Sequence, residues 1–243
     1  MIGQRGVGID LSTPAIPKAS IDSPQYSVIG EASVNHQIVL SLYDLTGKMV
    51  LPWHQAGYTC MIVDIQHPRG VSKTEDRLYK IGVDILEWIP PLEDYRIVFS
   101  FSPCNDMAVS GARWFQDKGL SALASGIALF SRGKEIGQWS RAPWMAEHPV
   151  STISSYYRKA DYIFSPHEFD GYTQEDNNYT KKTCIWHGNG FKIPSIKKPS
   201  QNPDNRIHRM PPSKDRANLR SATPMGFANA VFVANEIETV IAA

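Results

Sequence analysis

The sequence predicts an α/β fold with a mostly parallel sheet and helices on both faces. Two observations support this prediction. Short apolar runs rich in β-branched and aromatic residues, which are typical of buried strands, alternate along the chain with segments of helical character. In addition, a chain of 243 residues with 42% apolar content can bury one sizeable core.

The first elements form a βαβ unit. The stretch QIVLSLYD (37–44) predicts a strand, MVLPWHQAG (49–57) a short helix interrupted near its start by Pro52, and YTCMIVDI (58–65) a second strand. The strands of such a unit are parallel, and the crossover between them is right-handed.

The alternation of strands and helices continues after this unit. The later expected elements are, in chain order, strands at GVDILEWI (82–89) and RIVFSF (96–101), a helix from about Gly111 through ALASGIALFSRG (122–133), strands at ADYIFSP (160–166) and KKTCIWHG (181–188), and a helix at FANAVFVANEIETVIAA (227–243).

Composition divides the chain into four segments. Residues 1–34 are rich in Pro, Ser and Gly and predict an irregular arm. Residues 35–191 contain the alternating pattern and form the expected core. Residues 192–220 are a basic, proline-rich loop, and residues 221–243 contain the helix that returns to the core.

Charge and cysteine content exclude several classes of protein. The net charge is only +1, so a site for a polyanion must be local. Three cysteines without a CxxC pair, and scattered histidines, indicate a reducing compartment and no metal site. No apolar run reaches the ~18 residues of a membrane span, and the start lacks a signal peptide's apolar region. We therefore expect a soluble cytoplasmic protein without a membrane partner.

One cysteine lies in an unusual place. Cys104, in the stretch SPCND, follows the predicted strand RIVFSF, and the Pro, Asn and Asp around it end that strand. In open α/β sheets the carboxyl edge faces the ligand crevice, where a substrate can reach a thiol. The alternative is a small buried apolar residue, which is the more common role of a lone cysteine. Cys60 and Cys184 lie within apolar strand patterns and are expected to be core thiols.

Other predicted strands also end in polar residues. Thr46 and Gly47 after the first strand allow a tight turn, where a ligand can approach backbone N–H groups. Asp64 ends the second strand, where nucleotide-binding folds place a carboxylate that accepts ribose hydroxyls. Asp84 follows and can reach an adenine amino group. Each residue alone is weak evidence for a ligand site. Their order along the chain, with Cys104 after the next strand, is much more specific.

This order resembles DNA cytosine-5 methyltransferases, particularly the short, divergent versions of phages and prophages. The stretch YDLTG (43–47) matches the family's Phe-x-Gly-x-Gly loop, and Asp64 and Asp84 match its acidic residues. Pro103 and Cys104 match the Pro-Cys loop that holds the nucleophile.

Two later motifs extend the resemblance to about residues 38–240. EHPV (147–150) corresponds to the family's Glu-Asn-Val motif, and ANAV (228–231) to the Gly-Asn-x-Val segment that closes over the cofactor. The Gln-x-Arg-x-Arg motif is not found, and TKKT (180–183) takes its place in the order. Arg220 and Thr223 match an Arg-x-x-Thr motif, which we expect to be a structural brace.

Three positions depart from the family pattern. Leu45 replaces the first glycine of the cofactor loop, Asn105 replaces the Gln that usually follows the nucleophile, and His148 replaces the usual Asn. These departures affect the expected cofactor contacts more than the expected role of the cysteine.

The resemblance implies a Rossmann-like S-adenosylmethionine-dependent methyltransferase fold with a reduced target-recognition region. It implies that Cys104 adds to carbon 6 of cytosine, that Glu147 protonates nitrogen 3, and that Lys181 replaces the missing arginine as a point charge. The residues that it assigns to the cofactor, S-adenosyl-L-methionine, are Tyr43, Asp44, Thr46, Gly47, Asp64, Ile65, Asp84, Ser102, Asn229 and Val231.

The expected partner is double-stranded DNA with a flipped cytosine, because carbon 5 cannot be reached within a stacked duplex. The basic interval 192–220 stands where the family has its recognition lobe and can follow phosphates, although a solvated loop is the alternative. The phosphate contacts expected in it are Lys197, Lys198, Arg206, Arg209, Arg216 and Arg220. We expect a monomer or weak dimer in the cytoplasm of a bacterial host cell, encoded by the host or by a phage.

Two alternatives remain open. A related enzyme with the same nucleophile can act on a free pyrimidine nucleotide or make another base modification. A decayed methyltransferase that only binds DNA is a third class, which the presence of both Cys104 and Glu147 disfavours.

Overall fold

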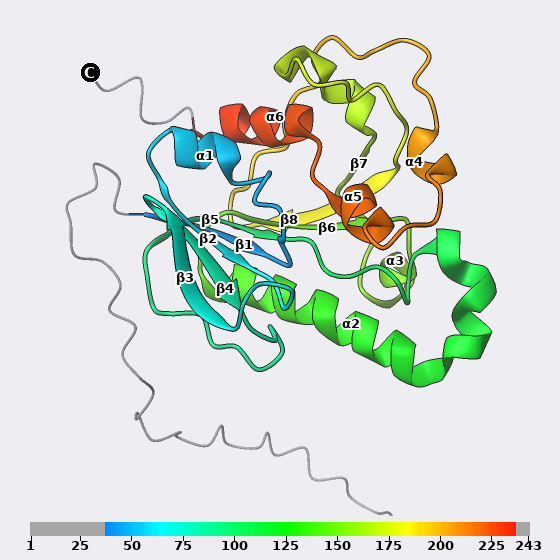
Figure 1. Ribbon diagram of the computed structural model, residues 1–243, viewed down its shortest axis with the longest axis horizontal. Helices are drawn as coiled ribbons and strands as arrows, with labels where there is room; N and C mark the ends of the chain where they lie inside the picture. The colour runs from blue at the N-terminus through cyan, green and yellow to red at the C-terminus, as the bar shows by residue number, and fades with distance from the viewer. Residues whose placement is uncertain (1–36, 237–243) are drawn as a thin grey trace, which may run out of the picture. The chain divides into compact units, whose positions relative to one another are not determined.

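Eight strands form one mixed sheet within residues 37–236, the part of the chain that the computed structural model describes (Figure 1). The order of the strands is β3-β4-β2-β1-β5-β6-β8-β7. Their bounds are β1 (Ile38–Leu42), β2 (Thr59–Val63), β3 (Gly70–Glu75), β4 (Leu78–Gly82), β5 (Tyr95–Ser100), β6 (Trp144–Pro149), β7 (Tyr162–Phe164) and β8 (Thr183–Gly188). The predicted arm, residues 1–34, and residues 237–243 of the predicted terminal helix lie outside the described part.

The helices within this range differ greatly in length. The α-helices are α1 (Leu51–Gln55), α2 (Phe115–Trp139, with a break at Gly119), α3 (Ile153–Tyr156), α4 (Arg206–Arg209), α5 (Arg216–Ser221) and α6 (Met225–Glu236). Two 3-10 helices are η1 (Val109–Trp114) and η2 (Pro166–Tyr172). No helix of the described range has both the length and the apolar character needed to cross a membrane.

Five neighbouring strands of the sheet are parallel. β1 pairs in parallel with β2 and β5, β2 with β4, and β5 with β6. Their order, β4-β2-β1-β5-β6, is the 3-2-1-4-5 arrangement of doubly wound folds, which places a ligand crevice at the carboxyl ends where the order reverses, between β1 and β5. β3, β8 and β7 add antiparallel pairs at the two edges. The structure therefore confirms a mostly parallel α/β sheet compatible with a Rossmann-like fold.

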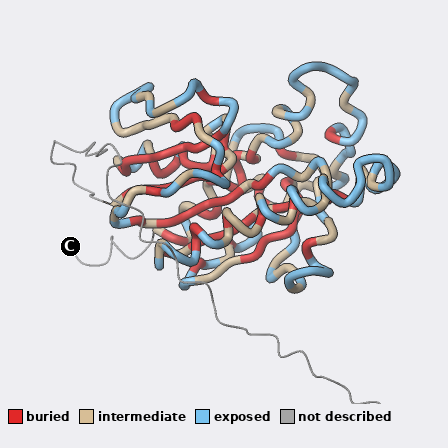
Figure 2. The backbone as a smooth tube through the Cα atoms, turned by 90° about the horizontal axis from the view of Figure 1, so that it is seen from below, coloured by how far each residue is buried: buried red, intermediate tan, exposed pale blue. Residues whose placement is uncertain are grey.

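Both faces of the sheet are covered (Figures 1 and 2). Side chains alternate along each strand, so that Val39 packs with Trp53 of α1 and Phe227 of α6, while Leu40 belongs to the cluster with Phe130 of α2. Strands buried on both faces are apolar throughout, which explains the continuous runs in the sequence. Cys60 and Cys184 are buried, as expected for core thiols.

Most expected elements are present, but the strand predicted at residues 82–89 is wrong. The strand at this place is β4, which ends at Gly82 and pairs with β3 in a hairpin that we did not predict. Residues after Gly82 form turns, because the Asp84 carboxylate accepts a hydrogen bond from the Leu86 N–H (2.9 Å) and the Asp84 carbonyl accepts one from Trp88 (2.9 Å). Such an Asx turn competes with strand hydrogen bonding.

Gly82 explains why β4 can end where it does. A Cβ atom at this position would lie 2.1 Å from the carbonyl oxygen of Pro68. Pro68 belongs to the loop after β2, so only a glycine lets this loop cross over the end of β4. The close crossing brings the loops after β2 and β4 together at the carboxyl edge.

The basic interval 192–220 contains two short helices, α4 and α5, rather than an entirely irregular loop. Backbone hydrogen bonds join this interval to the segment that precedes β8. The Thr180 N–H donates to the Asp204 carbonyl (2.8 Å), and the Asp204 N–H donates to the Asn178 carbonyl (3.2 Å). The interval therefore lies against the segment that precedes β8.

Candidate functional site

The carboxyl edge of the sheet gathers most of the expected site residues. β1, β2, β4 and β5 are parallel, so the loops that follow them, with Asp44, Asp64, Asp84 and Cys104, leave the sheet at one edge. β6 is parallel to β5, and β8 is antiparallel to β6. The start of β8 is consequently beside the end of β6, which brings Lys181 to the same edge.

Cys104 lies in a tight turn directly after β5. Its carbonyl accepts hydrogen bonds from the N–H groups of Met107 (3.2 Å) and Ala108 (2.9 Å), which turns the chain away from the sheet. The thiol is half-buried, in contrast to the fully enclosed thiols of Cys60 and Cys184. The turn therefore presents Cys104 at the edge of the sheet instead of in the core.

Glu147 lies in β6 and faces a small cavity. Its Oε1 atom is buried and has no hydrogen-bond partner among residues 37–236. The cavity has a volume of about 10 Å³, roughly the space of one water molecule. Its walls are Phe101, Glu147, Phe164, Lys181, Thr183, Ser221, Thr223, Pro224 and Phe227. Glu147 and Lys181, an acidic and a basic residue, thus line the same small cavity.

The charges around Cys104 have opposite effects on its thiol. Burial raises the pKa of Cys104, and the Glu147 carboxylate raises it further. Lys181 and Arg220 lower this pKa because positive charges favour the thiolate. The charges that act on the Cys104 thiol therefore come from three separate parts of the chain.

His148, which stands in place of the family's Asn, faces the opposite side of the sheet. It is fully buried, and its ring packs edge-on against Phe130 of α2, with ring centroids 6.1 Å apart. Burial lowers the pKa of His148, which keeps the imidazole neutral. The residue belongs to the packing under α2 and not to the cavity that Glu147 faces.

The turn after β1 is held together by Asp44. Its carboxylate accepts hydrogen bonds from the backbone N–H groups of Thr46 (3.1 Å) and Gly47 (2.7 Å) and from the Ser41 hydroxyl (2.8 Å). Gly47 has φ +69°, a conformation that favours glycine. The two N–H groups expected to approach a ligand are thus already satisfied within the turn.

Tyr43 is directed toward helix α2. Its hydroxyl donates a hydrogen bond to the Leu129 carbonyl (2.7 Å), and burial raises the pKa of the phenol. The hydroxyl is therefore committed to the helix in this structure.

Two substitutions of Asp44 are expected to change the free energy of unfolding differently: Asp44→Ala lowers it through lost hydrogen bonds, and the effect of Asp44→Asn depends on pH. Asp44→Ala leaves two N–H groups unsatisfied and should cost about 1–3 kcal/mol. Burial is the largest cause that raises the pKa of Asp44 above its usual value, so the carboxyl's contribution to stability is full at low pH and is lost as pH rises through the folded-state pKa. Asp44→Asn keeps an acceptor without the charge, and its stability relative to the parent should improve between pH 4 and pH 8. Urea unfolding of the parent and both variants at pH 4 and pH 8 measures these free energies. The same difference between Asp44→Asn and the parent at both pH values would contradict the prediction.

The acidic residues after β2 and β4 differ in exposure. Asp64 is 8% exposed, and its Oδ1 accepts a hydrogen bond from the Gln66 N–H (2.8 Å), while Asp84 is exposed. Ile65, which follows Asp64 in the loop after β2, is 70% exposed. Ser102 is buried, and its hydroxyl has no hydrogen-bond partner within the described range. These residues combine acceptors, an apolar surface and an unsatisfied hydroxyl along one edge.

The two predicted cofactor residues of α6 are placed differently. Asn229 donates a hydrogen bond to the Tyr172 carbonyl (2.8 Å) and lines an open groove of about 490 Å³ with Lys197. Val231 is completely buried in the core beside α1. The side chain of Val231 packs in the core and is not accessible to a ligand in this structure.

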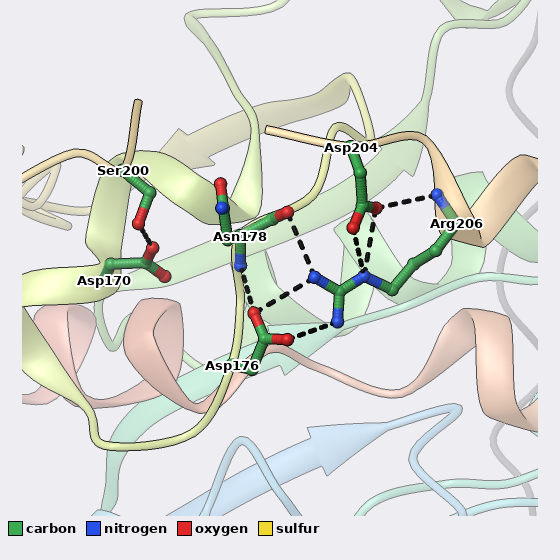
Figure 3. Close-up of polar contacts among 6 residues, drawn as sticks. All are labelled: Asp170, Asp176, Asn178, Ser200, Asp204 and Arg206. Carbon is green, nitrogen blue, oxygen red and sulfur yellow. Dashed lines mark hydrogen bonds and ion pairs between the residues drawn. The ribbon is translucent and has the colours of Figure 1, made fainter. Parts of the chain in front are cut away.

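Arg206 of the basic interval is bound by two carboxylates (Figure 3). Its Nη1 and Nη2 atoms contact Asp176 at 2.5 and 3.1 Å, and its Nε contacts Asp204 at 2.8 Å. The guanidinium also lies over the ring of Tyr179, 5.7 Å from its centroid. Arg206 therefore fixes the interval to the segment before β8, and its charge is offset within the protein.

The other expected phosphate contacts have different environments. Lys198 and Arg209 are exposed to solvent. Lys197 places its Nζ 5.0 Å from the centre of the Tyr172 ring, and Arg216 donates a hydrogen bond to the Met210 carbonyl (2.8 Å). Arg220 is half-buried, and its charge lowers the pKa of the Cys104 thiol. The basic interval thus contains both solvent-facing cations and cations directed into the protein.

The sequence did not predict the part of the cavity wall formed by Phe101, Thr223 and Pro224. The only signal in the sequence is the Arg-x-x-Thr match at Arg220 and Thr223, which predicts a structural brace. Thr223 is buried and faces the same cavity as Glu147.

Comparison with known proteins adds no further assignment: no protein-family model matches this chain, and a search of curated proteins finds no match.

Proposed function

We propose that this protein is an S-adenosylmethionine-dependent DNA cytosine-5 methyltransferase. The observation that carries the proposal is the grouping of a half-buried cysteine, a carboxylate without a hydrogen-bond partner among the described residues and two cations at the carboxyl edge of a parallel sheet. The resemblance to the methyltransferase family assigns Cys104, Glu147 and Lys181 to one site.

These residue types suit nucleophilic addition to a pyrimidine ring. The Cys104 thiolate adds to carbon 6 of cytosine, and Glu147 gives a proton to nitrogen 3, so that the electron pair moves to carbon 5. S-adenosylmethionine supplies the electrophilic methyl group that carbon 5 takes. Loss of the proton from carbon 5 then breaks the sulfur–carbon bond and regenerates Cys104.

Part of the carboxyl edge suits the cofactor. Asp64 would accept ribose hydroxyls, Ile65 would cover an adenine ring, and the unsatisfied hydroxyl of Ser102 would take a polar group. The turn at Thr46 and Gly47 would contribute shape rather than N–H donors, since Asp44 accepts their hydrogen bonds.

The cavity beside Glu147 must open before a base can enter. About 10 Å³ holds no more than one water molecule, whereas a cytosine ring is several times larger. Some walls belong to strands and to α6, whereas Ser221 is the last residue of α5, and Thr223 and Pro224 form the connection between α5 and α6. Movement of this connection is the simplest route by which a flipped cytosine reaches Cys104.

The direct test is incubation of the protein with DNA and S-adenosylmethionine labelled in its methyl group, followed by digestion to nucleosides. Label in 5-methyldeoxycytidine is expected. Tritium release from carbon 5 of a free cytosine nucleotide, with none from DNA, would instead identify a nucleotide-modifying enzyme. Absence of both label and tritium release, in a protein that binds DNA, would support the decayed binding protein.

Asp64→Ala is expected to weaken S-adenosylmethionine binding. Loss of the carboxylate leaves ribose hydroxyls without an acceptor, at a cost of about 1–3 kcal/mol, or roughly 5–150-fold in Kd. Titration calorimetry measures the change, and Glu75→Ala on β3, at the far edge of the sheet, is the control. Equal affinity of Asp64→Ala and the parent protein would exclude the proposed cofactor site.

DNA affinity is expected to depend on the solvent-facing cations of the basic interval. Each lost phosphate contact lowers the magnitude of the log–log salt slope by about 0.9, so Lys198→Ala with Arg209→Ala should lower it by up to about 1.8. Lys73→Ala removes an exposed charge from β3 and serves as the control. If the double variant and the control have the same slope, the interval does not contact phosphates through these residues.

A further inference from the structure

One stretch of the basic interval, which runs from the end of α4 through α5, is attached to the core mainly at its two ends (Figure 1). Ile207 before it and Thr223 after it are each 7% exposed, whereas no residue from 208 to 222 is buried. Two carboxylates also bind Arg206, next to Ile207. A segment with so few buried contacts opens at a lower cost in free energy than the core does. We call residues 208–222 the flap.

One hydrogen bond joins the flap to the loops of the sheet within the described range. Asn218 of α5 donates it to the side-chain oxygen of Gln66 (3.2 Å), which lies in the same loop after β2 as Asp64. The other side-chain hydrogen bonds of the flap, from Arg216 to Met210 and from Ser221 to Asn218, stay within it. The position of α5 at the carboxyl edge therefore depends on a single polar contact between side chains.

The end of the flap forms one wall of the cavity beside Glu147. Other walls are fixed in the core: Phe164 of β7 and Phe227 of α6 are stacked with ring centroids 4.2 Å apart, and they are 3% and 1% exposed. The wall at the flap is therefore the one that can move without disturbing the core. The residues of this wall are Ser221, Thr223 and Pro224.

We propose that the flap controls access to the cavity beside Glu147, and that the hydrogen bond between Asn218 and Gln66 holds the flap closed. The loop that carries Asp64 thus also holds the flap over the candidate site. The identity of the entering ligand, a flipped cytosine, rests on the proposed function, but the control of access by the flap does not.

The test is alkylation of a thiol placed in a fixed wall of the cavity by Thr183→Cys, in the full chain without DNA or cofactor. Thr183 of β8 is 3% exposed and lines the cavity, so iodoacetamide reaches this position only when the cavity opens. The thiolate displaces iodide and forms a sulfur–carbon bond. When opening and closing are faster than alkylation, the rate follows the population of the open state.

Gln66→Ala, added to Thr183→Cys, should accelerate this alkylation by about 2–10-fold, which is the effect of one hydrogen bond on the opening equilibrium. Gln66 is exposed, so its replacement leaves the core intact. Tandem mass spectrometry separates the introduced thiol from the neighbouring Cys184.

Matched variants identify the contact. Gln66→Glu keeps an acceptor for Asn218 and should leave the rate unchanged. Asn218→Ala should act like Gln66→Ala, and the two together should add little to either alone, because they remove the same contact. Gln201→Ala removes an exposed glutamine of the same interval outside the flap and should have no effect.

Hydrogen exchange is a second measurement that needs no introduced thiol. Gln66→Ala should speed the exchange of the Leu219 and Ala222 N–H groups, which donate hydrogen bonds within α5. Exchange of the Ala228 N–H, in the buried first part of α6, should not change.

Three outcomes would overturn the inference. If the introduced thiol reacts as fast as free cysteine while Gln66 is intact, nothing covers the cavity. Equal rates for Gln66→Ala and Gln66→Glu would mean that the hydrogen bond does not hold the flap. Faster alkylation of Cys60 as well would indicate a general loosening of the core. Methyl transfer is a separate measurement: if it fails while the flap responds, the proposed function is wrong and the role of the flap stands.

Discussion

Cys104 is expected to form a covalent adduct with DNA that contains 5-fluorocytosine, and Cys104→Ser is expected to abolish it. Addition of the thiolate and methyl transfer can proceed on this base, but carbon 5 then carries fluorine, which no base can remove as a proton. Elimination fails, and the protein remains bonded to carbon 6. A serine hydroxyl is a far weaker nucleophile than a thiolate, so the variant should give no adduct above background.

The adduct is detected as a slower band in denaturing electrophoresis, with S-adenosylmethionine present. Cys184→Ala is the control, because Cys184 is 3% exposed and belongs to the core. This variant should form the adduct as long as it folds. An adduct mapped to Cys60 or Cys184, or no adduct when both cofactor and DNA are bound, would contradict the role of Cys104.

The apolar pattern predicted three of the parallel strands, β1, β2 and β5, but neither β4 nor β6, and there is a physical reason for its success. β1, β2 and β5 are buried on both faces, so their sequences are continuous apolar runs that are easily recognised. The error at residues 82–89 arose because apolar residues there alternate with charged ones in a series of turns. Ile89 in this segment is 80% exposed, which its apolar character did not indicate.

The candidate site was predictable only in part, because sequence order does not reveal antiparallel pairing. Strand order indicated that Cys104 would lie at the carboxyl edge. The position of Lys181 at this edge depends on β8 running antiparallel to β6, and the placement of Ser221 and Thr223 in the cavity wall depends on the path of the chain at the end of α5. Neither feature has a local signal in the sequence.

Charge patterns predicted the basic interval but not the partners of its cations. Arg206 appeared equivalent to Arg209 in the sequence, yet Asp176 and Asp204 bind the former and the latter is exposed. Asp176 precedes Arg206 by thirty positions along the chain, so no short-range pattern connects them. The sequence alone therefore does not show which cations of a basic stretch are free to contact phosphates; the folded structure is needed to identify them.

Glu147→Gln is expected to have opposite effects on two reactions of the same thiol. Glutamine has nearly the same size as glutamate but cannot deliver a proton to nitrogen 3, so adduct formation with 5-fluorocytosine DNA should slow by about 10²–10⁴-fold. Removal of the carboxylate also removes a cause that raises the pKa of Cys104. The thiolate fraction at a given pH therefore increases, and alkylation of Cys104 by iodoacetamide should become faster.

Slower adduct formation combined with faster alkylation distinguishes a proton donor from a structural residue. A general loss of folding would instead change the accessibility of the thiol and affect both reactions in the same direction. Rapid-quench measurement of the adduct and mass mapping of alkylated Cys104 give the two rates, and calorimetry should show unchanged binding of S-adenosylmethionine. Glu75→Gln, on the exposed edge strand β3, should alter neither rate. If Glu147→Gln slowed both alkylation and adduct formation, Glu147 would not be the acid. Loss of a carboxylate that raises the pKa of Cys104 can only increase the thiolate fraction, so slower alkylation would indicate a general disturbance of the site.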